Sequence, residues 1–178
     1  MNSRKIFLLV AACLISLSLI LASCSKTVTF EQKRADVIKY LQAFNSIENS
    51  FDATYSQITF PQSVYTAADL IAWNAATTKL LTAYDGAISR LSELTPSSLE
   101  PSTNTHLQQA KSLYQSQRSL VKALQDARAI GNDAGIVQIV NELQTSYSSG
   151  SSLNRATEQL MLQYNISDSE VSYRFRGK

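Results

Sequence analysis

The sequence predicts an all-α protein, an up-down-up-down bundle of four helices, and three observations support this prediction. Apolar residues recur at intervals of three, four and seven over most of the chain, as they do along one face of an α-helix. Most of the three prolines and five glycines stand where these periodic stretches end. No segment alternates apolar and polar residues in the way that is typical of a half-buried strand.

The first helix is expected over residues 28–59. Apolar side chains recur there every seven residues, at Phe30, Val37, Phe44, Phe51 and Ile58. Leu41, Ile47 and Tyr55 fill this row at intervals of three or four, so one face of the helix is apolar. The segment 60–65, which contains Pro61, ends the helix.

The second helix is expected to begin near Thr66, because Asp69 follows three residues later and the pair forms a weaker version of the capping box. Its apolar face is made by two rows of side chains, Leu70, Thr77, Tyr84 and Leu91, with Leu81 and Ile88. The helix ends before Thr95, since the residue preceding a proline is steered out of helical geometry.

The third helix is expected from Pro101 or Ser102 to Ile130. Its apolar stripe is predicted at Leu113, Leu120, Leu124 and Ala127. Gly131 suits the left-handed conformation that commonly ends a helix, and Asn132 or Asp133 can cap the next one.

The fourth helix is expected from Ala134, with one face lined by Ile136, Val140, Leu143 and Tyr147. The serine- and glycine-rich residues 148–152 are either a patch of small residues within one helix or a break between two. The apolar stripe resumes close to helical phase at Leu153, Leu160 and Tyr164, which favours one kinked or locally loosened helix. From residue 165 onwards the periodicity is lost.

Short connections between long helices make neighbouring helices antiparallel, so the economical packing is an up-down-up-down bundle. The seven-residue spacing also permits a dimer, in which two hairpins replace one four-helix bundle.

The N-terminus carries a different pattern. Arg4 and Lys5 precede an uncharged stretch over residues 6–21, which ends in Leu21-Ala22-Ser23-Cys24. This ending resembles the lipobox of bacterial lipoproteins. The resemblance implies that a signal peptidase recognises Leu21, Ala22 and Ser23 and cuts before Cys24, whose thiol carries the lipid, with acyl chains such as palmitate. The alternative is an uncleaved signal anchor with an incidental cysteine.

The resemblance divides the chain into a signal peptide (1–23), a lipidated cysteine with a short tether (24–29), the helical bundle (30–165) and a C-terminal tail (166–178). It implies a protein held by lipid on the cell membrane or the outer membrane, facing outside the cytoplasm. By the same resemblance, a residue other than aspartate after the cysteine, here Ser25, directs a lipoprotein to the outer membrane of a two-membrane bacterium.

The composition of the mature chain excludes several functions. Removing Arg4 and Lys5 with the signal peptide leaves 14 of the 16 basic residues against 14 acidic ones, so a nucleic-acid partner is not expected. Cys13 is discarded and Cys24 is acylated, which leaves no thiol for a disulfide, a cysteine metal site or catalysis. No cofactor is expected.

No catalytic or metal site is predicted. His106 is the only histidine, and no Glu-x-x-His pair of the kind found in di-metal bundles is present. We expect His106 to be an amphipathic residue near one end of the bundle. The carboxylates are scattered and stand mostly beside basic residues on polar faces, as solvated side chains do. The protein is therefore not expected to be an enzyme.

Two groups of residues could carry a function. Four of the eight tyrosines fall on or near the helix seams, at Tyr55, Tyr84, Tyr147 and Tyr164. They could line a ligand cavity with hydroxyl donors, or be ordinary bundle tyrosines that lean out to water. The tail combines aromatic and basic side chains, Tyr173, Arg174, Phe175, Arg176 and Lys178. It is a candidate second membrane contact or, equally, a frayed terminus.

The function expected from the sequence is that of a lipid-anchored cell-envelope protein with a non-enzymatic helical domain, which provides an interaction or structural surface for an envelope protein partner. The alternative is a small-molecule binder that uses the tyrosine-lined core, for example to deliver a solute to a transporter. A buried cavity of a few hundred cubic ångströms would favour the binder, whereas a filled core with an exposed apolar patch would favour the protein partner.

Overall fold

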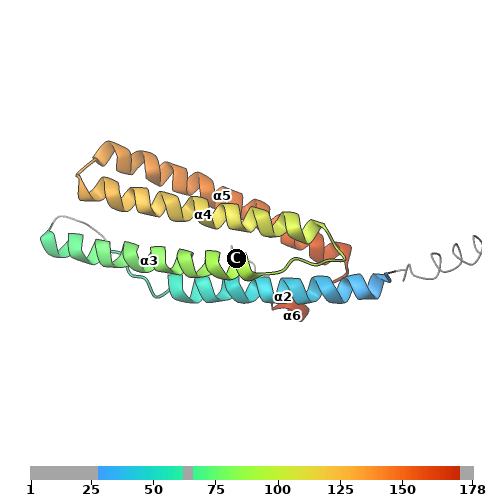
Figure 1. Cartoon of the computed structure of the whole chain (residues 1–178). Helices are drawn as coiled ribbons and strands as arrows, with labels where there is room; N and C mark the ends of the chain where they lie inside the picture. Colours follow the sequence, from blue (N-terminus) through green and yellow to red (C-terminus); the bar gives the residue numbers. More distant parts are fainter. Residues whose placement is uncertain (1–27, 62–65, 173–178) are drawn as a thin grey trace, which may run out of the picture.

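The computed structural model describes residues 28–61 and 66–172, without the side chains of residues 147–149. Every regular element in these ranges is a helix, and the described residues contain no strand. The elements are α2 (Phe30–Tyr55), α3 (Ala67–Glu93), α4 (Ser102–Ala129), α5 (Asp133–Gln163) and the short α6 (Asp168–Val171) (Figure 1). The prediction of an all-α protein with four long helices is therefore confirmed.

Local capping chemistry sets the starts of α2 and α3. The hydroxyl of Thr66 accepts a hydrogen bond from the Asp69 backbone N–H, and the Asp69 carboxylate accepts one from the Thr66 N–H, so the predicted capping box is present. Thr29 and Gln32 form a second capping box at α2, which the sequence analysis did not identify. Each box satisfies two backbone donors that a helix start leaves without a partner.

The turn between α4 and α5 follows the predicted chemistry. Gly131 adopts the left-handed conformation with φ +68°, which a residue with a side chain adopts only at a cost. The side chain of Asn132 then accepts a hydrogen bond from the Gly135 N–H and caps α5. Beyond this turn α5 is one continuous helix from Asp133 to Gln163, so the run 148–152 does not divide it.

The first helix is shorter than predicted, because α2 ends at Tyr55 rather than at residue 59. The β-branched residues Ile58 and Thr59 and the following Pro61 disfavour further helix. Ile58 and Phe60 instead fold back and pack against the core, where the Phe60 ring lies 5.3 Å from that of Trp73.

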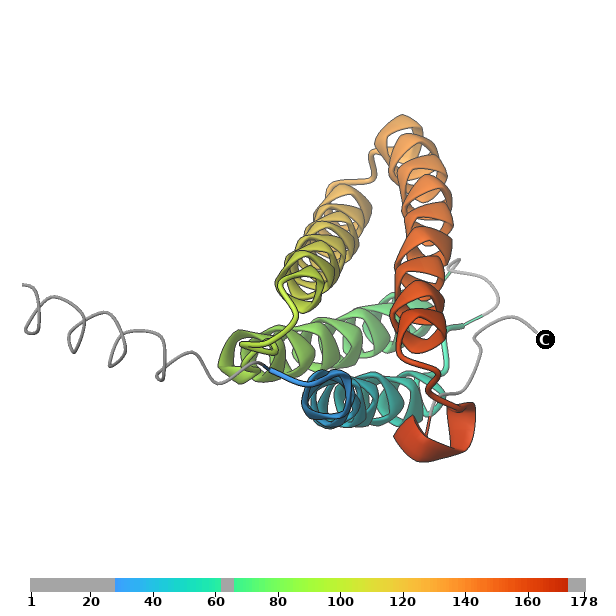
Figure 2. The same cartoon turned by 90° about the vertical axis from the view of Figure 1, so that its right-hand side faces the viewer.

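Consecutive helices pack side by side, α2 with α3, α3 with α4 and α4 with α5. Seen along the long axis, the four long helices surround a common centre (Figure 2). The core there consists of aliphatic and aromatic side chains from all four, among them Val37, Leu41, Phe44, Tyr84, Leu91, Leu107, Tyr114 and Leu160.

The predicted apolar stripe of α4 is half confirmed, because Leu124 and Ala127 are buried. Leu113 and Leu120 are only half-buried, whereas the neighbouring Tyr114 and Val121 are buried. In this middle part of α4, counting leucines misplaced the stripe by one position, because the buried residues there include the polar Gln117.

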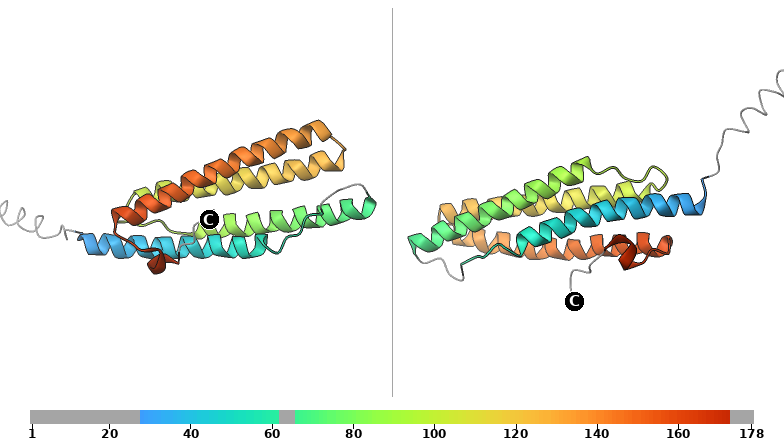
Figure 3. Two further views of the ribbon diagram at one scale, coloured as in Figure 1. Left: turned by 180° about the vertical axis from the view of Figure 1, so that it is seen from behind. Right: turned by 90° about the horizontal axis from the view of Figure 1, so that it is seen from below.

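The core does not extend along the whole molecule. The start of α3 and the hairpin of α4 and α5 extend past the end of α2 (Figures 1 and 3). None of residues 133–146 of α5 is buried, and Val137 in this stretch is 62% exposed. The predicted apolar face at Ile136, Val140 and Leu143 is therefore only partly covered, because α2 has ended where it would provide a fourth neighbour.

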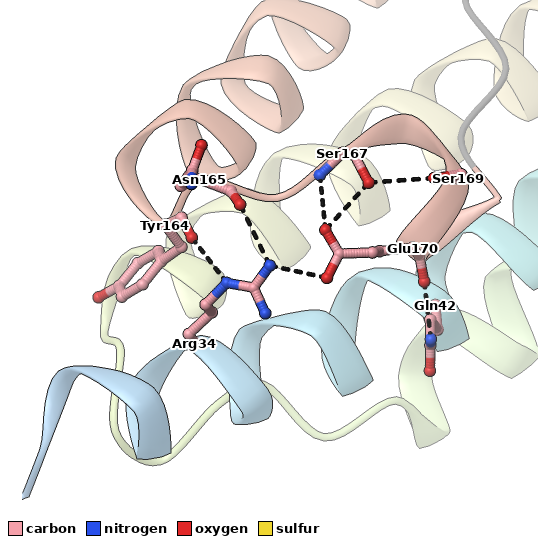
Figure 4. A network of polar contacts seen from close by, with 7 residues as sticks. All are labelled: Arg34, Gln42, Tyr164, Asn165, Ser167, Ser169 and Glu170. Carbon is pink, nitrogen blue, oxygen red and sulfur yellow. Dashed lines mark hydrogen bonds and ion pairs between the residues drawn. The ribbon is translucent and has the colours of Figure 1, made fainter.

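A network of hydrogen bonds joins residues 164–171 to α2 (Figure 4). The Arg34 guanidinium on α2 donates to the backbone carbonyls of Tyr164 and Asn165, at 3.1 Å each, and to the Glu170 carboxylate at 2.7 Å. Gln42 and Asn45, further along α2, donate to the carbonyls of Glu170 and Val171. The short helix α6 is thereby held on the side of α2.

The connection between α3 and α4 lies at the same end of the bundle. The Ser97 hydroxyl donates to the Asp36 carboxylate of α2 at 2.5 Å, and the same oxygen accepts hydrogen bonds from the backbone of Leu99 and Glu100. The first turns of α2, the 94–101 connection and the end of α5 therefore form one structural unit. None of the helices in the described ranges is long and apolar enough to cross a membrane.

Candidate ligand-binding site

The four tyrosines predicted to line a cavity do not all lie together. Tyr84 is buried and Tyr55 is 43% exposed, and both line one pocket in the middle of the bundle. Tyr164 is buried at the other end of the core, where its hydroxyl donates to the Glu100 carboxylate. The side chain of Tyr147 lies outside the described residues. The cavity prediction therefore applies to two of the four tyrosines.

This pocket, which we call the aromatic pocket, has a volume of about 270 Å³. All four long helices contribute to it, with Glu48, Phe51, Asp52 and Tyr55 from α2, Tyr84 from α3, Leu113, Tyr114 and Gln117 from α4, and Gly150, Ser151, Leu153 and Asn154 from α5. The exposed Tyr55 and Ser151 belong to its rim. The small residues Gly150 and Ser151 thus leave space beside the core.

Four aromatic rings form the apolar part of the pocket. The Phe51 ring lies 4.8 Å from that of Tyr84, 5.1 Å from that of Tyr114 and 6.2 Å from that of Tyr55. The rings of Tyr84 and Tyr114 are nearly perpendicular, at 73°. Such edge-to-face packing is favourable and holds each ring in one orientation.

The polar groups of the pocket contact one another. The Tyr114 hydroxyl donates to the Glu48 carboxylate at 2.5 Å, and the Tyr84 hydroxyl donates to the Gln117 side-chain oxygen at 3.3 Å. Glu48 and Asp52 are half-buried and stand one helical turn apart on α2. The lining therefore combines hydrogen-bonded hydroxyls with two carboxylates, which are acceptors when ionised.

Sequence reasoning missed Glu48, Phe51, Asp52 and Tyr114 as members of this site. A signal for α2 was present, because positions 48, 52 and 55 follow the helical spacing of four and three that places side chains on one face. No comparable signal connects Tyr114 to Glu48, which is 66 residues away in the sequence.

We expected His106 to be an amphipathic residue near one end of the bundle, but it is 2% exposed and sits inside the core. The Thr157 hydroxyl donates to the Leu153 carbonyl, so it must accept from His106 Nε2, which lies 2.8 Å away. His106 Nδ1 then accepts from the Tyr40 hydroxyl, also at 2.8 Å. Burial lowers the pKa of His106 to about 4. The imidazole is thus a neutral structural bridge between α2, α4 and α5.

The Tyr164–Glu100 contact is also structural in character. The Glu100 carboxylate accepts hydrogen bonds from the hydroxyls of Ser102 and Tyr164. Both bonds lower the pKa of Glu100, and the bond from Ser102 has the larger effect. Burial and the bond to Glu100 raise the pKa of Tyr164 to about 12. An ionised acceptor beside a neutral phenol therefore connects the α4 start to the α5 end.

A larger hollow of about 1140 Å³ lies along α4 and α5, outside the core. Most of its lining residues are polar, among them Gln108, Ser112, Gln138 and Asn141, but it includes the exposed Val137 and the half-buried Leu120. We call this the α4–α5 groove. Its size and openness to solvent suit a protein segment better than a small molecule.

Three further features considered from the sequence are a metal site, the lipobox and the C-terminal tail. Residues 28–61 and 66–172 contain no group of three or more His, Cys, Asp or Glu side chains placed to hold a metal ion. The lipobox residues Leu21 to Cys24 and the tail residues from Tyr173 onwards lie outside the described residues, so their predicted roles stay predictions.

Comparisons of this chain with models of protein families, with curated proteins and with solved structures found no match.

Proposed function

We propose that this chain is a lipid-anchored cell-envelope protein whose helical domain binds a small molecule in the aromatic pocket without catalysing a reaction. The observation that carries the proposal is the pocket of about 270 Å³ at which all four long helices meet. Ligand sites in bundles are commonly built in this way, from side chains on facing helices. The sequence favoured a protein-binding surface, and the aromatic pocket changes that preference.

The anchor is the other half of the proposal. Lipid on Cys24 would hold the mature protein on the cell membrane or the outer membrane, and only residues 25–29 separate it from α2, a reach of roughly 20 Å at most. The unit formed by the α2 start, the 94–101 connection and the α5 end would then face the lipid. In an up-down-up-down order, the α4–α5 turn would point away from it. Basic and aromatic residues of the tail, Arg174 and Phe175 among them, would add a second membrane contact.

The anchor is tested by fractionating cells that produce the Cys24→Ser variant. We expect the protein to move from the membrane fraction to the soluble fraction and to lose labelling by a palmitate analogue. Cys13→Ser is the matched control, because Cys13 belongs to the part that is cut away, and it should change neither result. A Cys24→Ser protein that stays on the membrane and is still processed would contradict the lipidation.

The binding function is tested by native mass spectrometry of the lipoprotein extracted from its own membranes. We expect one low-mass molecule per chain. Ser151→Trp should displace it, because Ser151 is exposed at the rim of the aromatic pocket. Ser152→Trp is the control, since the adjacent Ser152 is also exposed but lines the α4–α5 groove. A preparation that carries no small molecule under these conditions counts against the proposal.

A second function, binding of an envelope protein partner, is favoured by a different observation. The far half of α5 leaves Val137 and Val140 exposed beside the α4–α5 groove, and Ile130 at the turn is 79% exposed. The Ser151→Trp and Ser152→Trp variants also distinguish this second function from small-molecule binding. A partner that co-purifies with the Ser151→Trp variant but not with the Ser152→Trp variant would assign binding to the groove.

A further inference from the structure

The aromatic pocket contains negative charge on one wall. Glu48 and Asp52 both line it from the same face of α2, one helical turn apart, and Tyr55 follows on the next turn of that face. No lysine or arginine is among its described lining residues. Two carboxylates at this spacing repel each other, and a cation between them reduces that repulsion.

Much of the remaining lining is aromatic, beside the aliphatic Leu113 and Leu153 and small or polar residues such as Ser151. Phe51, Tyr55, Tyr84 and Tyr114 all line the pocket, and the ring of Tyr114 stands at 76° to that of Phe51 and at 73° to that of Tyr84. Rings set at such angles are far from parallel, so their faces point in different directions. The face of an aromatic ring is its negative side, and it attracts an ammonium group within about 6 Å.

The donor set distinguishes between kinds of cation. A bare Ca²⁺ or Mg²⁺ takes six or more oxygen ligands and gains little from the four aromatic rings that make up a large part of this lining. An ammonium group on carbon uses both features, because its charge faces the carboxylates and its alkyl surface contacts the rings. The volume of about 270 Å³ lies just below the range of about 300–1,000 Å³ for drug-sized ligands, which limits the ligand to a small molecule.

We infer that the aromatic pocket binds a small organic cation, an amine or quaternary ammonium compound, between the rings of Tyr55, Tyr84 and Tyr114 and the carboxylates of Glu48 and Asp52. This inference rests on the proposed small-molecule function and names its ligand class. Tyr114 orients one of the two acids, because its hydroxyl donates to Glu48 at 2.5 Å and holds the carboxylate beside the ring.

The test is calorimetric titration of the full mature chain with choline and with 3,3-dimethylbutan-1-ol, which has the same shape and no charge. We expect choline to bind at one site per chain and the neutral compound to bind at least tenfold more weakly. Asp52→Asn should weaken choline binding about tenfold and leave the neutral compound unaffected. Glu93→Gln is the matched control, since Glu93 is exposed at the end of α3 and lies outside the pocket.

The contribution of the rings is tested at Tyr55, which is exposed enough to be changed without emptying the core. Tyr55→Phe keeps the ring face and should retain choline binding, whereas Tyr55→Leu should lose most of it. Equal binding of the two variants would contradict an ammonium site that uses this ring.

The outcomes separate this inference from the function on which it rests. If choline and its neutral analogue bind equally well and both lose binding in Ser151→Trp, the inference of a cationic ligand is wrong, whereas the proposed small-molecule function stands. An anionic or neutral molecule recovered in the native spectra would do the same. Absence of binding by either compound, together with native spectra that show no bound molecule, would overturn both.

Discussion

The hydrogen bonds of His106 require its neutral form, so this residue makes the stability of the protein depend on pH. The imidazole accepts from Tyr40 and donates to Thr157, and both bonds belong to its neutral form. The rings of Tyr40 and Phe44 cover it edge-on, at 5.7 and 4.6 Å. A proton on Nδ1 would displace the Tyr40 donor and place a charge in the core, which is the cause of the lowered pKa.

The free energy of unfolding should therefore fall as the pH falls from about 6.5 to about 4. In this window the unfolded chain binds a proton on His106 and the folded chain does not, so acid favours the unfolded state. The folded pKa of about 4 corresponds to a loss of about 3 kcal/mol across the window. Urea denaturation at pH 7 and at pH 4.5 measures it.

The comparison for this prediction is His106→Gln, which lacks the titrating group. Its stability at pH 7 should be lower than that of the natural chain, while its loss between pH 7 and pH 4.5 should be much smaller. A pH dependence of the same size in both proteins would show that other groups cause it.

Individual residues show where sequence reasoning ends. The partners of His106 come from helices 51 and 66 residues away, and no spacing rule links such distant positions. The same holds for Tyr114 and Glu48. Tyr84 and Tyr55 could be predicted as pocket residues because they lie on helix seams. Tyr164 lies on a seam too, and only the fold shows that Glu100 is its neighbour.

At the scale of elements, Arg34 joins three parts of the chain. It supplies donors to two carbonyls at the end of α5 and to the Glu170 carboxylate of α6. Hydrogen bonds from the Ser167 backbone N–H and, with a smaller effect, from Arg34 lower the pKa of Glu170 to about 2. The ion pair therefore persists in the folded protein down to about pH 2, and the stability that it contributes is complete above pH 4.5 and is lost as the pH falls from 4.5 to 2.

Arg34→Ala should destabilise the protein by about 1–2 kcal/mol, because it removes charge-assisted hydrogen bonds that lysine cannot replace with the same geometry. Arg34→Lys should recover less than half of the loss. Amide exchange of residues 166–172 should rise in both variants, as α6 detaches from α2. Arg155→Ala, at an exposed position on α5, is the control and should be neutral.

Two glycines should respond in opposite ways to the same substitution. Gly86 lies inside α3 with ordinary helical geometry, and nothing lies within 4 Å of an added Cβ. Gly86→Ala should stabilise the protein by about 0.5–1 kcal/mol through the backbone entropy of the unfolded chain. Gly131 has an equally open Cβ position but a φ of +68°, so Gly131→Ala should destabilise it by about 1–2 kcal/mol.

Denaturation curves of the two glycine variants measure this difference directly. Because space is available at both positions, the sign depends on backbone conformation alone. A stabilising Gly131→Ala substitution would mean that the α4–α5 turn is not left-handed in solution.

The elements themselves were largely predictable, because caps and breaks are local. Thr66 with Asp69, and Gly131 with Asn132, act within four residues, and both were identified from the sequence. The end of α2 was wrong by four residues, since the apolar row continues to Ile58 after the helix has stopped. The heptad position of Ile58 correctly indicated contact with the core. Ile58 is partly buried there and packs from a turn rather than from a helix.

At the scale of the whole molecule, the bundle has two unlike halves. Near the start of α2 the core is enclosed by four helices and by α6, and it contains Val37, Leu91 and Val171, all fully buried. Beyond the end of α2 the hairpin of α4 and α5 extends with its apolar face only partly covered. The sequence predicts an amphipathic helix in both halves equally well, because periodicity shows which face is apolar and not whether another helix reaches it.

This asymmetry predicts a gradient of local stability along α5. Amides of residues 133–146 should exchange with solvent at least tenfold faster than those of residues 153–163, because few buried apolar contacts oppose their opening. Hydrogen exchange of the mature chain at low micromolar concentration measures it. Gly131→Ala should increase exchange in the first segment more than in the second.

The concentration dependence of this exchange shows what covers the far half. If a second copy packs there, as the seven-residue spacing allows, protection of residues 133–146 should rise with protein concentration, and Val137→Asp should abolish that rise. If protection is low and independent of concentration, this half of α5 is uncovered in the isolated protein. Its exposed apolar side chains then contact either a different protein or water.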